Sequence, residues 1–212
     1  MFKEKNKKIL ILAPHTDDGE FGCGGTINKL IEEGHEVYYV AFSPCKQSVG
    51  SGYPSDILIT EVKAAVKVLG VKQENLKLLD YDVRTFNYRR QEILDDIINL
   101  RSEIQPDMVF IPALTDMHQD HKTVAEEALR AFKFTTILSY ELPWNNISFQ
   151  TSCFFKLSED NLKAKINALK KYESQAHRPY ANEHFIESLA TVRGVQINAK
   201  YAETFEVIRW IN

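Results

Sequence analysis

The segment that decides the fold is Lys8-Ile9-Leu10-Ile11-Leu12-Ala13, which runs directly into Pro14-His15-Thr16-Asp17-Asp18. A short apolar run bounded by a proline and charged residues is typical of a strand buried in a parallel sheet. Similar runs alternate with longer segments of helical period, and they cover Glu36–Phe42, Leu76–Tyr81, Met108–Pro112 and Thr136–Leu142. This alternation predicts an α/β fold of three layers, α/β/α, with a mostly parallel sheet.

The segments between these runs are expected to be helices that cover the sheet. A glycine-rich turn, Gly22-Cys23-Gly24-Gly25-Thr26, is expected to lead into a helix that ends near Glu33, because Gly34 suits a helix C-terminus. Further helices are expected from Ser55 or Asp56 to Leu69 and over Tyr88–Glu103, Lys122–Phe132 and Glu159–Ser174, with further strands over residues 148–157 and Thr204–Trp210. No linker or repeat interrupts the chain, so residues 1–212 are interpreted as a single domain.

Composition excludes several classes of function. A formal charge of −3 and an isoelectric point near 6.1 indicate no nucleic-acid partner. No apolar stretch is long enough to suggest a membrane span. The three cysteines, Cys23, Cys45 and Cys153, lack the spacing of a disulfide framework or a thiolate metal site. A reducing, cytoplasmic location is therefore expected.

Two clusters of histidine and carboxylate residues each follow a predicted strand. The first is His15-Thr16-Asp17-Asp18-Gly19-Glu20, and the second is Asp116-Met117-His118-Gln119-Asp120-His121. In an open parallel sheet the loops after the strands lie at the same edge, where ligands bind. An Asp-Asp pair alone is most often a helix cap, but two such clusters at one edge predict a shared site.

The residue types in these clusters suit a catalytic zinc site. His15, Asp18 and His121 can supply three ligands to Zn²⁺ and leave one position open for water. Asp17 is the candidate general base for that water. His118 is a candidate to stabilise the oxyanion or to protonate the leaving amine. Asp120 is the candidate carboxylate that orients one of the imidazoles.

Two further residues are candidates for substrate binding. Arg84 follows the third predicted strand and could reach a substrate carboxylate or phosphate, although a surface ion pair is an equal alternative. Trp144 could stack on a sugar ring, with a role in the core as the alternative. The late segment with His177, Arg178 and His184 is polar and could line or cover the site.

Several motifs resemble the PIG-L / LmbE-like deacetylases. The stretch Ala13–Thr26 is similar to the family's A-H-P-D-D-x-E-x-x-x-G-G-T signature, and His118–His121 is similar to its H-x-D-H. Shorter resemblances extend along nearly the whole chain, at Pro106-Asp107, Tyr172–Gln175, Arg193-Gly194 and Tyr201–Phe205.

The resemblance implies a Rossmann-like fold and a zinc-dependent hydrolase that removes an N-acyl group, usually acetyl, from an amino sugar or its conjugate. It also implies that His15, Asp18 and His121 bind zinc, that Asp17 is the base, and that His118 stabilises the transition state with Asp120 as its partner. A small-molecule sugar substrate and a homo-oligomer are further implications. The chain departs from the family pattern at Thr16, Gly19 and Leu58, where many members carry proline, glutamate and a sugar-contacting arginine.

Two other functions remain open at this point. A phosphoester hydrolase would favour a carboxylate-rich site with two metal ions. A non-catalytic module that binds a sugar or nucleotide would keep the fold and bind ligand without releasing amine. The metal stoichiometry and an assay of amine release distinguish these alternatives.

Overall fold

The fold is built on one seven-stranded sheet. The computed structural model describes residues 6–211. Across the sheet the strands lie in the order β3 (Leu76–Leu78), β2 (Glu36–Ser43), β1 (Lys8–His15), β4 (Met108–Pro112), β5 (Thr136–Tyr140), β7 (Tyr201–Arg209) and β6 (Cys153–Leu157). The first five are mutually parallel, and β7 is antiparallel to both of its neighbours. The sheet is therefore mostly parallel, as the sequence predicted.

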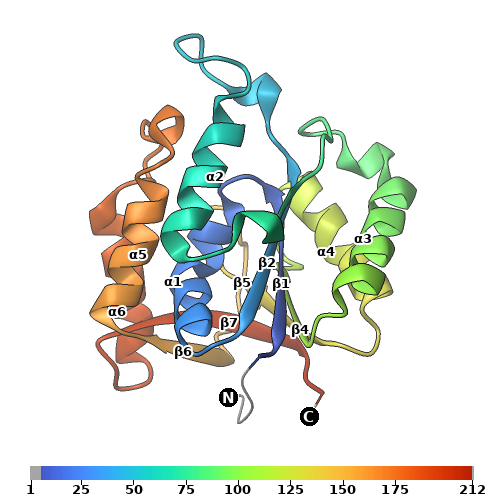
Figure 1. Ribbon diagram of the computed structural model, residues 1–212. Helices are drawn as coiled ribbons and strands as arrows, with labels where there is room; N and C mark the ends of the chain where they lie inside the picture. Colours follow the sequence, from blue (N-terminus) through green and yellow to red (C-terminus); the bar gives the residue numbers. More distant parts are fainter. Residues whose placement is uncertain (1–5, 212) are drawn as a thin grey trace.

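Helices cover both faces of the sheet (Figure 1). One layer contains α1 (Asp18–Glu32), α2 (Ile57–Leu69), α5 (Glu159–Leu169) and α6 (Glu183–Val195), and the other contains α3 (Arg90–Ile104) and α4 (Gln119–Ala131). Alternate residues of β1 divide between the two cores: Ile9 and Ile11 pack under the first layer, and Leu10 and Leu12 under the second. This period of two accounts for the continuous apolar run, because both faces of the strand are buried. None of the helices described is long and apolar enough to cross a membrane.

The strand order places a crevice between β1 and β4. From β1 the chain moves outward to β2 and β3, and it then returns to add β4 on the other side of β1. The loops after β1 and β4 consequently diverge to opposite faces of the sheet. In open α/β sheets this reversal of strand order is where ligands bind.

Two details of the predicted structure are wrong. The glycine-rich segment is not a turn before a helix, because residues 22–26 lie within α1, which is bent at Cys23 (φ −147°, ψ 22°). In addition, α6 was not predicted; its polar and apolar residues form a weak helical pattern that was interpreted as a polar late segment. The remaining differences are shifts of element ends, the largest being the end of α5 at Leu169 and the start of β6 at Cys153.

Candidate metal and active site

The two clusters come together at the crevice between β1 and β4. His15 is the last residue of β1, and Asp17 and Asp18 stand at the start of α1. His118 and His121 lie at the N-terminus of α4, where the His118 ring accepts the main-chain N–H of Asp120 at 3.2 Å. The hundred residues between the clusters are thus bridged by the pairing of β1 with β4.

Three side-chain atoms form a nearly equilateral triangle. His15 Nδ1, Asp18 Oδ2 and His121 Nε2 lie 3.1 Å from one another along all three edges. Ligands about 2.0–2.2 Å from a common tetrahedral centre are separated by similar distances. His118 lies close by, and one nitrogen of each of the three histidines falls within 4.8 Å of the others. The three histidines could therefore hold a metal ion. The most closely spaced donor atoms are those of Asp18, His15 and His121.

Two carboxylates hold the far sides of the His15 and His121 imidazoles. Asp120 Oδ2 lies 3.0 Å from His15 Nε2, and Asp116 Oδ2 lies 2.7 Å from His121 Nδ1. If each imidazole donates its N–H to its carboxylate, the other ring nitrogen presents a lone pair to the triangle, which is the usual arrangement around a bound metal. Asp116 was not assigned a role from the sequence. The available signal was its position in the same cluster, five residues before His121.

The Asp120 carboxylate lies closer to His15 than to His118, its expected partner. His118 Nδ1 and Asp120 Oδ2 are 4.0 Å apart, whereas Asp120 accepts hydrogen bonds from His15, from the main-chain N–H of Arg84 at 2.5 Å and from that of Phe86 at 3.3 Å. The carboxylate is directed toward the loop that contains Arg84 because His15 and two main-chain donors surround it. Asp120 therefore orients His15 and ties this loop to α4.

The electrostatics of the triangle match a site built for a cation. Burial alone would lower the pKa of His121, but Asp18 and Asp116 outweigh it and raise that pKa to about 10. Burial would raise the pKa of Asp18, yet His121 and His15 hold it far below its usual range. A positive charge among these groups is thus strongly favoured, and a bound metal ion supplies one without protonating the imidazoles.

Asp17 and His118 lie outside the triangle. Their pKa values are shifted in the opposite directions to those of Asp18 and His121. Burial, together with the charge of Asp18, raises the pKa of Asp17 to about 6. Burial and the charge of His121 lower the pKa of His118 to about 4. At neutral pH the site therefore presents an ionised carboxylate of raised basicity and a neutral imidazole.

A cavity of about 370 Å³ opens onto these residues. Both predicted substrate-binding residues, Arg84 and Trp144, line it, and so does Leu58. One face of the Trp144 indole is already covered, because the Tyr180 ring stacks on it at 3.9 Å and 5°. Arg178, from the late polar segment that the sequence suggested could line or cover the site, also lines the cavity. It was not assigned a binding role from the sequence.

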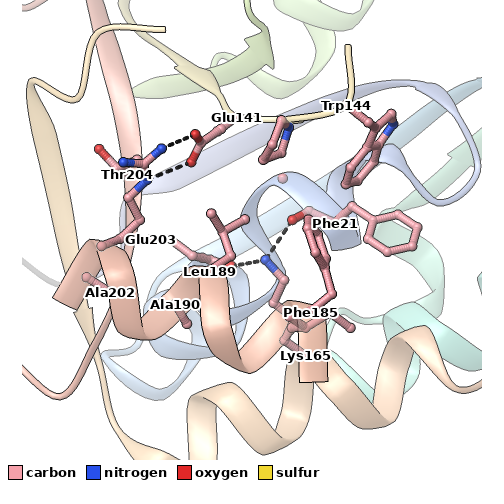
Figure 2. Close-up of a pocket in the computed structure, with 14 residues that line it drawn as sticks. Phe21, Glu141, Trp144, Lys165, Phe185, Leu189, Ala190, Ala202, Glu203 and Thr204 are labelled. Atoms are coloured by element: carbon pink, nitrogen blue, oxygen red, sulfur yellow. Dashed lines mark hydrogen bonds and ion pairs between the residues drawn. The ribbon is translucent and has the colours of Figure 1, made fainter. Parts of the chain in front are cut away.

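A second cavity lies on the other side of Phe21 and Trp144 (Figure 2). It has room for about 20 Å³, the space of roughly one water molecule, and is too small for a sugar. Its charged groups pair with each other: Arg193 with Glu141, and Lys165 with Glu203 at 2.6 Å. Glu203 faces α1 and Lys165, and Arg193 therefore pairs with Glu141 alone among the carboxylates of this cavity.

The fold and this site together define an α/β protein with a histidine–carboxylate cluster that could hold a metal ion beside a cavity. The chain belongs to the PIG-L family, described as GlcNAc-PI de-N-acetylase, whose model matches residues 10–132. It is accordingly a deacetylase, a hydrolase that acts on carbon–nitrogen bonds.

Individual relatives support this membership over most of the chain. The uncharacterized deacetylase YaiS of Escherichia coli K12 is 31% identical over 175 residues, which cover 80% of this chain and 92% of that protein. A diacetylchitobiose deacetylase of Thermococcus kodakarensis is 24% identical and covers 93% of this chain and 81% of its own. The solved N,N'-diacetylchitobiose deacetylase of Pyrococcus horikoshii is 25% identical, with a TM-score of 0.80 over 95% of this chain and 84% of that one.

Proposed function

We propose that this protein is a zinc-dependent hydrolase that removes an N-acyl group, in particular acetyl, from an amino sugar or amino-sugar conjugate, and that residues 1–212 form one domain of this type. The observation that carries the proposal is the triangle of donor atoms next to Asp17, His118 and a cavity of about 370 Å³. The family description and the similar diacetylchitobiose deacetylases favour an acetylated amino sugar as substrate.

The donor set fits zinc. Two imidazole nitrogens and one carboxylate oxygen are a common ligand set of catalytic zinc, and three protein ligands leave a position open. We assign the third position to Asp18, because its Oδ2 is 3.1 Å from both ligand nitrogens, whereas His118 uses Nδ1 to accept the N–H of Asp120. When bound there, zinc would acidify a water molecule and polarise the acyl carbonyl.

Asp17 is proposed as the general base. With its pKa raised to about 6, the carboxylate is ionised at neutral pH and is more basic than an ordinary aspartate. Asp17 takes a proton from the attacking water and returns it to the amine nitrogen as the carbon–nitrogen bond breaks. The carboxylate is thereby regenerated for the next turnover.

His118 is proposed to stabilise the transition state. Its Nδ1 accepts the main-chain N–H of Asp120, so the proton of the neutral ring is on Nε2. A hydrogen bond from Nε2 to the former carbonyl oxygen would strengthen as negative charge develops on that oxygen.

Three substitutions test these roles. Asp18→Asn is expected to lose most of its zinc and its activity. Asp17→Asn and His118→Gln are expected to keep about one zinc per chain and to lose roughly 10²–10⁴-fold in turnover. Zinc content is measured by elemental analysis, and amine release is measured on N-acetyl and N-formyl amino sugars and their nucleotide forms, with and without chelator.

The outcomes separate the alternatives. Full activity in Asp17→Asn, or zinc loss from His118→Gln with zinc retained by Asp18→Asn, would contradict the assigned roles. About two metal ions per chain with hydrolysis of phosphoesters would favour the phosphoesterase alternative. Ligand binding without amine release by the zinc-loaded protein would favour the non-catalytic module.

A further inference from the structure

Two arginines, Arg84 and Arg178, line the cavity, and neither has an ion pair or a hydrogen bond to a carboxylate of the described residues. Arg84 donates from Nη2 to Ser48 Oγ at 3.1 Å, and Arg178 donates to the side chains of Gln175 and Tyr180. Among the described residues neither has an ion pair, whereas four other arginines each pair with a glutamate: Arg89, Arg90, Arg130 and Arg193. No hydrogen-bonded carboxylate of the described residues neutralises these two positive charges. Both guanidinium groups are therefore available to a ligand in the cavity.

The guanidinium of Arg178 is fixed in place by neutral groups. Its Nε donates to Gln175 Oε1 at 2.7 Å, and its Nη1 donates to the Tyr180 hydroxyl at 3.0 Å. The Tyr180 ring is in turn stacked on Trp144. Of the five N–H groups of a guanidinium, these contacts use two, so three have no protein acceptor among the described residues. A fixed guanidinium with free N–H groups loses little conformational entropy when it binds a planar or tetrahedral anion.

The loop that contains Arg178 is anchored to α2. Ser174 donates to Glu61 from its main-chain N–H at 2.9 Å and from its hydroxyl at 2.6 Å. Leu58, about one turn before Glu61 on the same helix, lines the cavity with an apolar side chain. Arg178 therefore brings a positive charge to the cavity from the loop that is fastened to this helix.

The charges in the cavity favour an anionic ligand. The carboxylates of its lining are Asp17 and Asp18, and Asp18 is engaged by His15 and His121. Asp17 attracts Arg178 through space and makes no hydrogen bond to it. A zinc ion bound to Asp18 would add further positive charge, so the lining would be net positive when the enzyme is loaded.

We propose that the substrate carries a carboxylate or phosphate group, apart from its N-acyl group, and that Arg178 and Arg84 bind this anion and so determine specificity. This inference rests on the proposed deacetylase function and names the substrate class more narrowly. Recognition of either anion uses the same chemistry, because arginine donates paired hydrogen bonds to both.

The test compares three matched substrates: N-acetylglucosamine, its 6-phosphate, and N-acetylglucosaminuronic acid, which has a carboxylate at the same carbon. With zinc-loaded wild-type protein, kcat/KM for at least one anionic substrate is expected to exceed that for the neutral sugar by about tenfold or more. In Arg178→Gln this ratio is expected to fall to within about threefold of unity. Arg130→Gln, on the exposed side of α4, is the matched control and is expected to keep the wild-type ratio.

A binding measurement distinguishes failure of this inference from failure of the proposed function. Calorimetry is carried out with the deacetylated products, glucosamine 6-phosphate and glucosaminuronic acid. Arg178-dependent binding of either, weakened about tenfold in Arg178→Gln, supports the anion site even if no substrate is hydrolysed. Hydrolysis of the neutral sugar as fast as of both anionic ones, or product binding unchanged in Arg178→Gln, overturns the inference and leaves the deacetylase function standing.

Discussion

The two adjacent aspartates Asp17 and Asp18 differ because of their neighbours. Asp18 lies 3.1 Å from two imidazole nitrogens, and these groups hold its pKa far below the usual range despite burial. Asp17 lies beside Asp18 without such a partner, and its pKa rises to about 6. One residue is thereby suited to hold a metal and the next to accept a proton, although their side chains are chemically identical.

Glu20 is a second buried carboxyl whose state is determined by its surroundings. It is fully buried, and its two oxygens contact the hydroxyls of Tyr39 and Tyr172, which also contact the carbonyl of Thr16. Two tyrosine protons cannot satisfy these four contacts, and a proton on Glu20 supplies a third. Burial raises the pKa of Glu20 to about 8, although the hydrogen bonds from both tyrosines oppose this rise.

We expect Glu20 to make the folded state less stable as pH rises. Between its unfolded pKa near 4.5 and its folded pKa of about 8, the folded protein retains a proton that the unfolded chain has released. The free energy of unfolding therefore decreases across this window, by up to about 1.4 kcal/mol per pH unit from this group. Glu20→Gln is expected to remove this component. Urea unfolding of chelator-treated protein at pH 5 to 8 checks it, and identical pH slopes for the two proteins would contradict it.

At the scale of elements, the bend in α1 determines where the site residues stand. Beyond Cys23 the helix restarts, and the main-chain N–H groups of Gly25 and Thr26 donate to Glu203 on β7 at 3.1 and 2.6 Å. Lys165 on α5 donates hydrogen bonds to Glu203 and to the carbonyl of Phe21 (Figure 2). Both donor–acceptor distances are 2.6 Å. Two elements, β7 and α5, thus hold the bend, and the first turn of α1 with Asp18 is directed at the crevice.

Breaking this buried ion pair is expected to destabilise the protein. Lys165→Met leaves Glu203 charged and buried, with main-chain donors alone, and should cost about 3–5 kcal/mol of unfolding free energy. The double variant Lys165→Met/Glu203→Gln removes both charges and should regain part of the loss. Denaturant unfolding measures both. Lys200→Met, which removes the exposed partner of Glu159, is the control and should leave stability unchanged. Equal effects of Lys165→Met and Lys200→Met would refute the role of the buried pair.

At the scale of the whole molecule, the site joins two parts of the chain. His15 and Asp18 come from the β1–α1 unit and His121 from α4, which lie in different helical layers. A metal ion bound by all three would link these layers. It would also supply the positive charge that Asp18 and Asp116 favour at this position, where they raise the pKa of His121 to about 10. Binding that is specific to the folded state stabilises it by mass action.

Removal of the metal is therefore expected to lower thermal stability. At a free zinc concentration 100 times the dissociation constant, the gain is about 2.7 kcal/mol, which corresponds to roughly 5–10 °C in Tm for a chain of this size. Differential scanning calorimetry with zinc and with chelator measures the shift. Asp18→Asn should show little shift, and a full shift in that variant would contradict Asp18 as a ligand.

The sequence by itself predicted the mostly parallel sheet, the helical layers and the clustering of the candidate site residues. The apolar strands and the polar residues at their ends suffice for these predictions, because the loops that follow parallel strands lie at one edge of the sheet. The proximity of His15, Asp18 and His121 could thus be predicted, although His15 and His121 are 106 positions apart in the sequence.

The tertiary structure alone decided which partners these residues have. Asp120 contacts His15, Asp116 holds His121, Glu203 closes the bend of α1, and the Arg178 guanidinium is held by Gln175 and Tyr180. Each of these outcomes depends on the direction of a side chain and on the path of a loop after helix packing. Side-chain direction and loop path are not encoded by a sequence periodicity or by a local propensity. Both are determined only when the whole chain packs.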